Sequence, residues 1–316
     1  MLAKPHNASS KTWWKRAAVT LWQEKYLWLM ILPVIVYYII FFYVPMYGVV
    51  IAFKNYNIAK GILSSPWADP LLKYFQQFFS SIYFTRLVRN TALINLYSTV
   101  FSFPIPILFA LLLNEVSNMK ARRVMQTVSY MPHFLSTVVI VGMLVNFLSL
   151  GDGLVNALIK RLGGTAIDFI GSTRWFRTIY IASGVWQSFG WNSIIYLAAI
   201  TSIDQEIYDA AMLDGCSKLQ EIRFITLPSI ASTIIILLIL HFGSIMNVGF
   251  EKIYLLYTPG TYEVADVIST YVYRAGITNA QFSLSTAVGL FNSVINLVLL
   301  LLVNWISAKV SEISLF

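Results

Sequence analysis

The sequence contains few groups that could carry out covalent or metal chemistry. The three histidines, His6, His133 and His241, lie far apart, and none has a cysteine or carboxylate nearby at metal-ligand spacing. Cys216 is the single cysteine, so no disulfide can form within the chain. Neither a G-x-x-x-x-G-K-[ST] phosphate loop nor a G-x-S-x-G nucleophile elbow is present. We therefore expect no catalytic residue, metal or cofactor in this chain.

Polar and aromatic side chains recur inside long apolar stretches, where they could bind a sugar by hydrogen bonding and ring stacking. Two stretches, 178–201 and 228–250, combine tryptophan or histidine with amides, and a third, 283–308, has amides and small residues on one helical face. The candidates for a substrate path are Trp186, Gln187, Trp191, Asn192, His241, Ser244, Asn247 and Asn292. Small and amide side chains also hold membrane helices together, so helix packing is the alternative interpretation, favoured first for the stretch that contains Asn292.

The composition is that of a membrane protein. Of the 316 residues, 58% are hydrophobic and 11% are charged, whereas soluble domains have about 25% charged residues. Mean hydropathy is +0.69, and a soluble globule of this size could not bury so much apolar surface. A net charge of +8 would suit nucleic acid in a soluble protein. Here we interpret it as attraction to lipid phosphates and a signal for membrane orientation.

Six stretches are long and apolar enough to cross a bilayer as helices, which takes about 20 residues each. Pro104 and Pro106 predict a kink in the second stretch. The six predicted spans are 27–53, 87–113, 125–150, 178–201, 228–250 and 283–308. The predicted fold is an all-α polytopic bundle. An even number of spans places both termini on one side of the membrane.

Charged residues outside the spans give two further indications. All 14 acidic residues lie outside the six stretches, which disfavours an ion-coupled secondary transporter, because such proteins usually keep a carboxylate at membrane depth. Lysine and arginine are shared equally between the two sides, 11 and 11, so the positive-inside rule gives no orientation over the whole chain. Residues 1–26 form a basic, tryptophan-containing segment that we expect at the membrane interface, ahead of one permease-sized domain at 27–316.

The most informative segment lies between the fourth and fifth stretches, at 202–228. Residues 203–213 are good helix formers with a broad apolar face. Gly215 then supplies the positive φ that ends a helix, and Ser217 is placed to cap a second short helix. Pro228 suits the first turn of the fifth span. The segment therefore predicts a helix, a turn and a second helix, although an amphipathic connector resting on the membrane would show much of the same pattern.

Seven residues of this segment follow a strict spacing: an acidic residue, two alanines, three residues, a glycine, nine residues, then isoleucine, any residue, leucine and proline. The residues are Asp209, Ala210, Ala211, Gly215, Ile225, Leu227 and Pro228. This pattern resembles the EAA loop of permease subunits of binding-protein-dependent ABC importers. Aspartate stands at 209 where that loop usually has glutamate, so the carboxylate reaches one methylene less far. Asp214, beside the glycine, completes the candidate ATPase-coupling residues.

The resemblance extends over most of the chain. The segments 250–257, 265–274 and 282–292 are similar to carbohydrate importers for oligosaccharides or fragments of acidic polysaccharides such as alginate and pectin. The resemblance implies a bacterial inner-membrane permease with cytoplasmic termini, a second related permease, two cytoplasmic ATPases that bind ATP and Mg²⁺, and an external solute-binding protein. The loop would dock on an ATPase, and ATP-driven closure would move the spans in alternating access.

Three other functions are disfavoured by particular features. An ion-coupled transporter lacks its carboxylate, and a membrane enzyme acting on lipid lacks a cluster of acid, base or nucleophile. An exporter conflicts with the EAA-like loop. A membrane-embedded sugar pathway also needs an entrance, for which we expect the tyrosines and basic residues of the outer loops, including Arg174, Arg177 and Arg274. The alternatives for these residues are an interfacial aromatic belt and contacts to lipid headgroups.

Overall fold

The computed structural model describes residues 24–243 and 249–311, and in these ranges the chain is built from helices, with one isolated bridge between Lys54 and Trp67 in place of any sheet. Three segments are long and apolar enough to cross a membrane: Lys25–Phe53, Phe84–Asn114 and Phe282–Lys309. They confirm the first, second and sixth predicted spans. Most of the predicted N-terminal interfacial segment lies outside the described residues.

These three spans are assembled from several helical elements. The second breaks at Phe103, directly before Pro104, because proline has no N–H to continue the helix but suits a first turn. The elements are α2 (Lys25–Tyr38), η1 (Ile39–Tyr43), α3 (Val44–Met46) and η2 (Tyr47–Phe53) in the first span, α6 (Phe84–Ser102) and α7 (Pro104–Asn114) in the second, and α19 (Phe282–Ser311) in the last.

The third predicted span is wrong as a single helix. Residues 125–150 fall on α8 (Met119–Tyr130), η3 (Met131–Phe134) and α9 (Thr137–Leu148), and the two halves meet at 97°. Pro132 stands in η3, and Leu135 is extended, with φ −76° and ψ 134°. Ser136 then caps α9 by accepting a hydrogen bond from the Val139 N–H at 3.4 Å. The hydropathy pattern does not predict this turn, because the residues on both sides of it are apolar.

The fourth predicted span is α11 (Thr173–Thr201), which has 29 residues and is about 44 Å long. Gln187, Asn192 and several serines make it less apolar than the three spans above, so length and composition together do not mark it as a span. It packs against α6, α7 and α8 and contributes Phe176 and Ile181 to the main buried cluster. Ser183 and Ser193 are buried in this packing and Gln187 is half-buried, whereas Asn192 is exposed.

The fifth predicted span begins and ends differently from the prediction. A helical run from Lys218 to Ser229 contains α13 (Lys218–Glu221), η4 (Ile222–Thr226) and α14 (Leu227–Ser229), and it meets α15 (Ala231–Gly243) at 61°. Pro228 therefore opens only the short α14, while the longer helix begins after Ile230. At the other end, Phe250 belongs to a separate helix, α16 (Phe250–Leu256). The two bent pairs count as two spans at most, which gives up to five spans in the described residues. The fourth predicted span lies on α11, which is long enough to cross a bilayer but not apolar enough to be counted.

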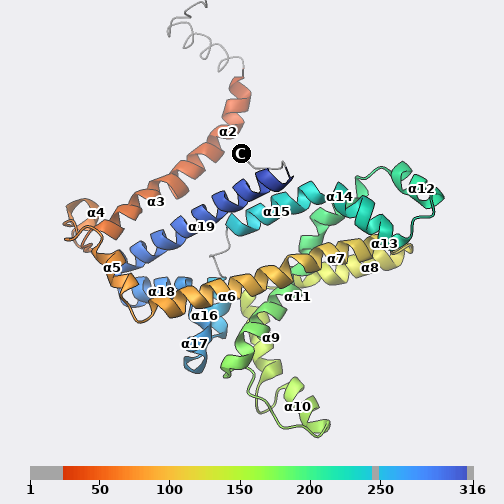
Figure 1. Cartoon of the computed structure of the whole chain (residues 1–316). Helices are drawn as coiled ribbons and strands as arrows, with labels where there is room; N and C mark the ends of the chain where they lie inside the picture. Colours follow the sequence, from red (N-terminus) through yellow and green to blue (C-terminus); the bar gives the residue numbers. More distant parts are fainter. Residues whose placement is uncertain (1–23, 244–248, 312–316) are drawn as a thin grey trace, which may run out of the picture.

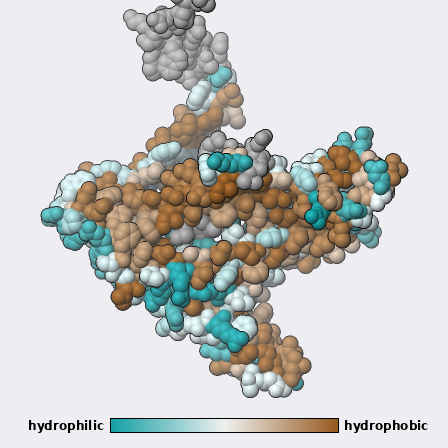
Figure 2. Space-filling view, viewed as in Figure 1, coloured by the Kyte–Doolittle hydropathy of each residue, from teal (hydrophilic) through white to brown (hydrophobic). Residues whose placement is uncertain are grey.

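The long helices run side by side and leave the short ones at the margins (Figure 1). α12 (Gln205–Leu213) and α13 lie together at one end, which we call the α12 end, and α4 (Gly61–Ser64) and α5 (Lys73–Phe79) lie at the opposite, α5 end. α9 and α10 (Leu154–Arg161) project from the body, as does α17 (Tyr262–Ala265) to a lesser extent, whereas α18 (Ile268–Tyr273) lies beside α6 and α19. Hydrophobic residues cover most of the visible face, and hydrophilic ones gather toward the two ends (Figure 2).

Candidate functional site

The segment 202–228 folds as its pattern predicts. Asp204 caps α12 by accepting a hydrogen bond from the Glu206 N–H at 3.0 Å. After α12, Gly215 has φ +76°, and the Cys216 N–H donates to the Ala211 carbonyl at 2.9 Å. This is the usual way a glycine closes a helix, since a side chain would strain a left-handed residue. The turn therefore holds the two helices in a defined relation.

Side-chain contacts tie the second helix to the first. The Ser217 N–H donates to Gln220 Oε1 at 2.8 Å, and Tyr208 in α12 shares a 2.9 Å hydrogen bond with Thr226 Oγ1 in η4. Lys218 lies 2.6 Å from Glu221, and this hydrogen bond raises the pKa of Lys218 above its ordinary value, so the ammonium stays charged. The loop and the start of the α14–α15 span are thus linked by a side-chain hydrogen bond.

The outer surface of this loop is exposed and partly apolar. Leu213 is 90% exposed, Leu219 79% and Phe224 65%. Of the candidate coupling residues, Asp209, Ala210, Asp214, Gly215 and Pro228 are exposed, whereas Ala211, Ile225 and Leu227 are half-buried. Large apolar groups at a protruding end are typical of a protein interaction site.

The predicted path residues are distributed over three cavities along α6 and α11. The largest, about 830 Å³, is mainly apolar and is lined by Trp186, with Arg174 and Arg177 at the start of α11. A second, about 240 Å³, is lined by Ser98, Gln187 and Lys252 among others. Arg174 and Arg177 thus bring positive charge to the large cavity.

The third cavity, about 180 Å³, brings Asn192 and His241 together. The His241 Nε2 atom lies 2.8 Å from Thr99 Oγ1, which attaches α15 to α6. Ser102 lines both this cavity and the one that contains Gln187, so polar groups follow one another along the same pair of helices. Gln187 itself donates to the Leu135 carbonyl at 3.2 Å, at the bend before α9.

Other path candidates lie elsewhere. Trp191 stacks on His133, with ring centroids 4.6 Å apart and planes 2° from parallel, and lines none of the three cavities. Asn292, on α19, also lines none of them. Ser244 and Asn247 lie outside the described residues. The structure therefore places Gln187 on one small cavity and Asn192 and His241 on a neighbouring one that shares Ser102, with Trp186 on the large cavity.

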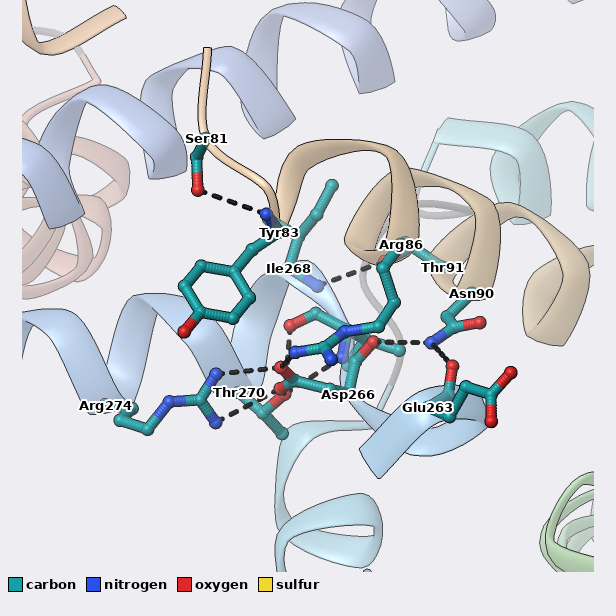
Figure 3. A network of polar contacts seen from close by, with 11 residues as sticks. Ser81, Tyr83, Arg86, Asn90, Thr91, Glu263, Asp266, Ile268, Thr270 and Arg274 are labelled. Carbon is teal, nitrogen blue, oxygen red and sulfur yellow. Dashed lines mark hydrogen bonds and ion pairs between the residues drawn. The ribbon is translucent and has the colours of Figure 1, made fainter. Parts of the chain in front are cut away.

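An ionic network, which sequence reasoning did not find, anchors the segment after α17 (Figure 3). Asp266 is fully buried and lies 3.2 Å from Arg86 and 2.8 Å from Arg274. Asn90 in α6 donates to the backbone carbonyls of Glu263 and Asp266. Asp266 stands in the run VADVI at 264–268, and nothing in that run shows that its carboxylate is buried. Only the fold brings Arg86 to it from 180 residues away.

Arg274 and Arg86 also face a cavity of about 440 Å³ that contains three tyrosines, Tyr83, Tyr262 and Tyr271. The guanidinium carbon of Arg274 lies 5.8 Å from the ring centroids of both Tyr262 and Tyr271. These residues fall at the side of the molecule away from α12 (Figure 1). Two tyrosines of the loop between α15 and α19 therefore lie beside Arg274, and their role at an entrance stays a prediction.

The long apolar spans define a polytopic membrane protein as the class. A family model described as "Binding-protein-dependent transport system inner membrane component" matches residues 102–312, and the chain belongs to this family. It is thus a permease component of an ABC transport system, the class predicted from the sequence.

Among curated relatives, the chain is 45% identical over 298 residues to the polygalacturonan/rhamnogalacturonan transport system permease protein YteP of Bacillus subtilis, covering 94% of this chain and 92% of the relative. It is 42% identical over 294 residues to the protein LplB of the same organism, covering 93% and 92%.

Two solved structures share the fold. One is a bacterial ABC transporter involved in the import of the acidic polysaccharide alginate, with a TM-score of 0.87, 42% identity, and 94% of this chain and 99% of that chain covered. The other is a bacterial alginate ABC transporter in complex with alginate pentasaccharide-bound periplasmic protein, with a TM-score of 0.86, 41% identity, and 94% and 98% covered.

Proposed function

We propose that this chain forms half of the membrane pathway of a bacterial inner-membrane importer for acidic oligosaccharides. A second permease subunit, two ATPases that bind ATP and Mg²⁺, and an external solute-binding protein would complete the complex. The polygalacturonan/rhamnogalacturonan relative and the two alginate transporters support the acidic sugar, as does the arginine pair Arg174 and Arg177 on the largest of the three cavities. ATP binding in the partner subunits would alternate the access of the path between the two sides.

The observation that carries this proposal is the geometry of the α12–α13 loop. Its exposed face, with Asp209, Ala210 and the apolar Leu213, is shaped to enter a cleft on a partner ATPase. The Tyr208–Thr226 hydrogen bond supports transmission of movement from α12 to the α14–α15 span. With the α12 end in the cytoplasm, both termini lie on that side, and the Arg174, Arg177 and Arg274 residues face the exterior.

The test is ATP hydrolysis by the co-purified complex in lipid, with and without sugar-loaded binding protein, for Gly215→Pro. Proline holds φ near −65° and lacks the N–H that Gly215 donates to the Met212 carbonyl at 3.1 Å, so the turn cannot form. A misplaced proline costs about 3 kcal/mol. We therefore expect stimulated hydrolysis to fall at least about tenfold, although the complex still assembles.

Gly215→Asn is the matched control, because asparagine tolerates a left-handed backbone and no atom lies within 4 Å of a Cβ placed there. It should retain most of the stimulation. Unchanged stimulation in Gly215→Pro would remove the coupling role from this loop. Transport driven by an ion gradient, with an ATPase-dead partner, would then become the function to test.

A further inference from the structure

Lys252 is a buried lysine whose Nζ atom has no hydrogen-bond partner among the described residues. Its side chain extends from α16, the residue is 8% exposed, and its Nζ atom makes no hydrogen bond or ion pair within the part of the chain that the structure describes. The ring centroid of Tyr180 is 5.3 Å from Nζ. A Cβ atom placed on Gly184 would lie 3.5 Å from Nζ, so the ammonium sits against the backbone of α11. An uncompensated ammonium away from water is unfavourable.

The other buried charged residues of the described chain are all compensated. Asp266 contacts two arginines, and Glu221 contacts Lys218 at 2.6 Å. Lys54, 5% exposed, donates to the Ile62 and Leu63 carbonyls at 2.8 and 3.1 Å. The fold therefore provides partners for buried charge as a rule, and Lys252 is the exception. An exception of this kind indicates a group whose partner arrives from outside the chain.

The residues around Lys252 indicate the chemistry of that partner. The cavity that Lys252 lines, about 240 Å³, has hydroxyl and amide groups and no carboxylate among its lining residues. They are Ser98, Ser102, Tyr180, Ile181, Gly184, Gln187 and Ser188. One cation among neutral hydrogen-bonding groups is complementary to a carboxylate carried on a hydroxyl-rich molecule. The ring of Tyr180 adds a surface on which a sugar ring can pack.

The position of the cavity fits a molecule in transit. Ile181 also lines the large cavity that holds Arg174 and Arg177, and Ser102 also lines the cavity that holds Asn192 and His241. Lys252 thus stands between a basic region at the start of α11 and a neutral polar region nearer its end. A carboxylated sugar entering past the arginines would meet one more cation before the neutral part of the route.

We propose that Lys252 is a carboxylate-binding residue of the translocation path, which holds one uronate carboxylate of an acidic oligosaccharide through an ion pair with Nζ. The inference rests on the proposed function and adds the residue that recognises the charge of the substrate inside the membrane. It requires a small opening of the cavity around Nζ, of the kind that alternating access produces.

The experiment uses the whole complex, purified in lipid nanodiscs, and two probes, trigalacturonate and its methyl ester, which lacks the negative charges. Binding of each radiolabelled probe is measured by equilibrium dialysis without the binding protein, and ATP-dependent uptake is measured in liposomes with it. In Lys252→Met we expect trigalacturonate binding to weaken at least about tenfold, because an ion pair between desolvated charges contributes at least that much to affinity. Binding of the uncharged ester should change less than about twofold.

Two further variants keep the result interpretable. Lys252→Arg retains the charge and should retain the preference for the acid over the ester. Lys309→Met removes an exposed lysine near the end of α19 that lines none of the cavities described above, and it should leave binding of both probes unchanged. Assembly and basal ATP hydrolysis of each variant show whether the complex is folded.

The outcomes separate the inference from the function on which it rests. If wild type transports trigalacturonate and Lys252→Met keeps the full preference for the acid, Lys252 does not bind the carboxylate. Equal loss of acid and ester binding in Lys252→Met would assign Lys252 a structural role and would overturn the proposal. The proposal would also be overturned if wild type transported trigalacturonate but showed no measurable binding of it without the binding protein. Absence of ATP-dependent uptake of trigalacturonate by wild type would overturn the acidic-sugar function itself.

Discussion

Single residues decide how the loop after α17 is held. Asp266 comes from a segment with little regular structure, yet it is fully buried because Arg86, Arg274 and Thr270 all contact its carboxylate. The side chains of Arg86 and Arg274 remain 32% and 29% exposed, so both guanidinium groups are partly hydrated. The network joins α6 to the segment 263–274 and thereby positions the arginines of the neighbouring cavity (Figure 3).

We predict that Asp266→Asn destabilises the protein. The substitution removes the charge that compensates both arginines, and breaking a buried ion pair costs about 3 kcal/mol at the lower end of the measured range, which applies here because the arginines are partly hydrated. Denaturant unfolding of the purified complex in detergent measures the loss. Glu263→Gln is the control, since Glu263 is exposed and only its backbone carbonyl joins the network. Equal losses in the two variants would contradict a special role for Asp266.

Two of the predicted spans are interrupted by sharp bends. The 97° turn between α8 and α9 and the 61° turn between α14 and α15 both occur near a proline, where the backbone hydrogen-bond ladder is interrupted. The second turn joins the α12–α13 loop to α15. It therefore lies where movement of the loop would be converted into movement of a span.

At this scale we predict that Tyr208→Phe weakens coupling. The change removes the hydroxyl that bonds Thr226 and leaves the aromatic ring in place, at a cost of about 1 kcal/mol. Stimulated ATP hydrolysis should fall several-fold, and basal hydrolysis should stay near the wild-type value. A double-mutant cycle with Thr226→Val tests the bond directly, because the double variant should lose little more than either single one. Full additivity of the two losses would mean that the hydrogen bond does not couple the helices.

The whole molecule exposes far more apolar surface than a soluble protein could. The first span, Lys25–Phe53, stands away from the other helices over its first half, and residues of α2 and α3 are all exposed (Figure 1). Lipid or the second permease subunit must cover this surface in the membrane. Orientation is a second property of the whole molecule, and the equal lysine and arginine counts on its two sides do not determine it.

The single cysteine offers a test of orientation without any substitution. Cys216 lies in the α12–α13 turn and is half-buried. We predict that a membrane-impermeant maleimide labels it in inside-out vesicles and not in intact spheroplasts, because the α12 end faces the cytoplasm in the proposed topology. Lys160→Cys in a Cys216→Ser background is the opposite control and should be labelled from outside. Labelling of Cys216 in intact spheroplasts would reverse the topology and remove the loop from contact with ATPases.

The sequence by itself determined the class of fold and the local form of the α12–α13 loop. Apolar runs of about 20 residues require helices in a membrane, and Gly215 with its left-handed backbone ends α12 where the pattern predicts. The fourth span was also predictable, although its amides and serines make it less apolar than the others. Helix formation and the turn that ends a helix depend on residues close together in the sequence, so the sequence pattern predicts them.

Tertiary structure decided the rest. The bend at Pro132 was missed because apolar residues continue through it, and hydropathy does not measure direction. Asp266 and Arg86 meet across 180 residues. Gly184 and Tyr180 of α11 lie beside Lys252 Nζ, which has no hydrogen-bond partner in the described part of the chain. Burial and pairing of charge are set by residues distant in sequence, so they become visible only when the helices are packed.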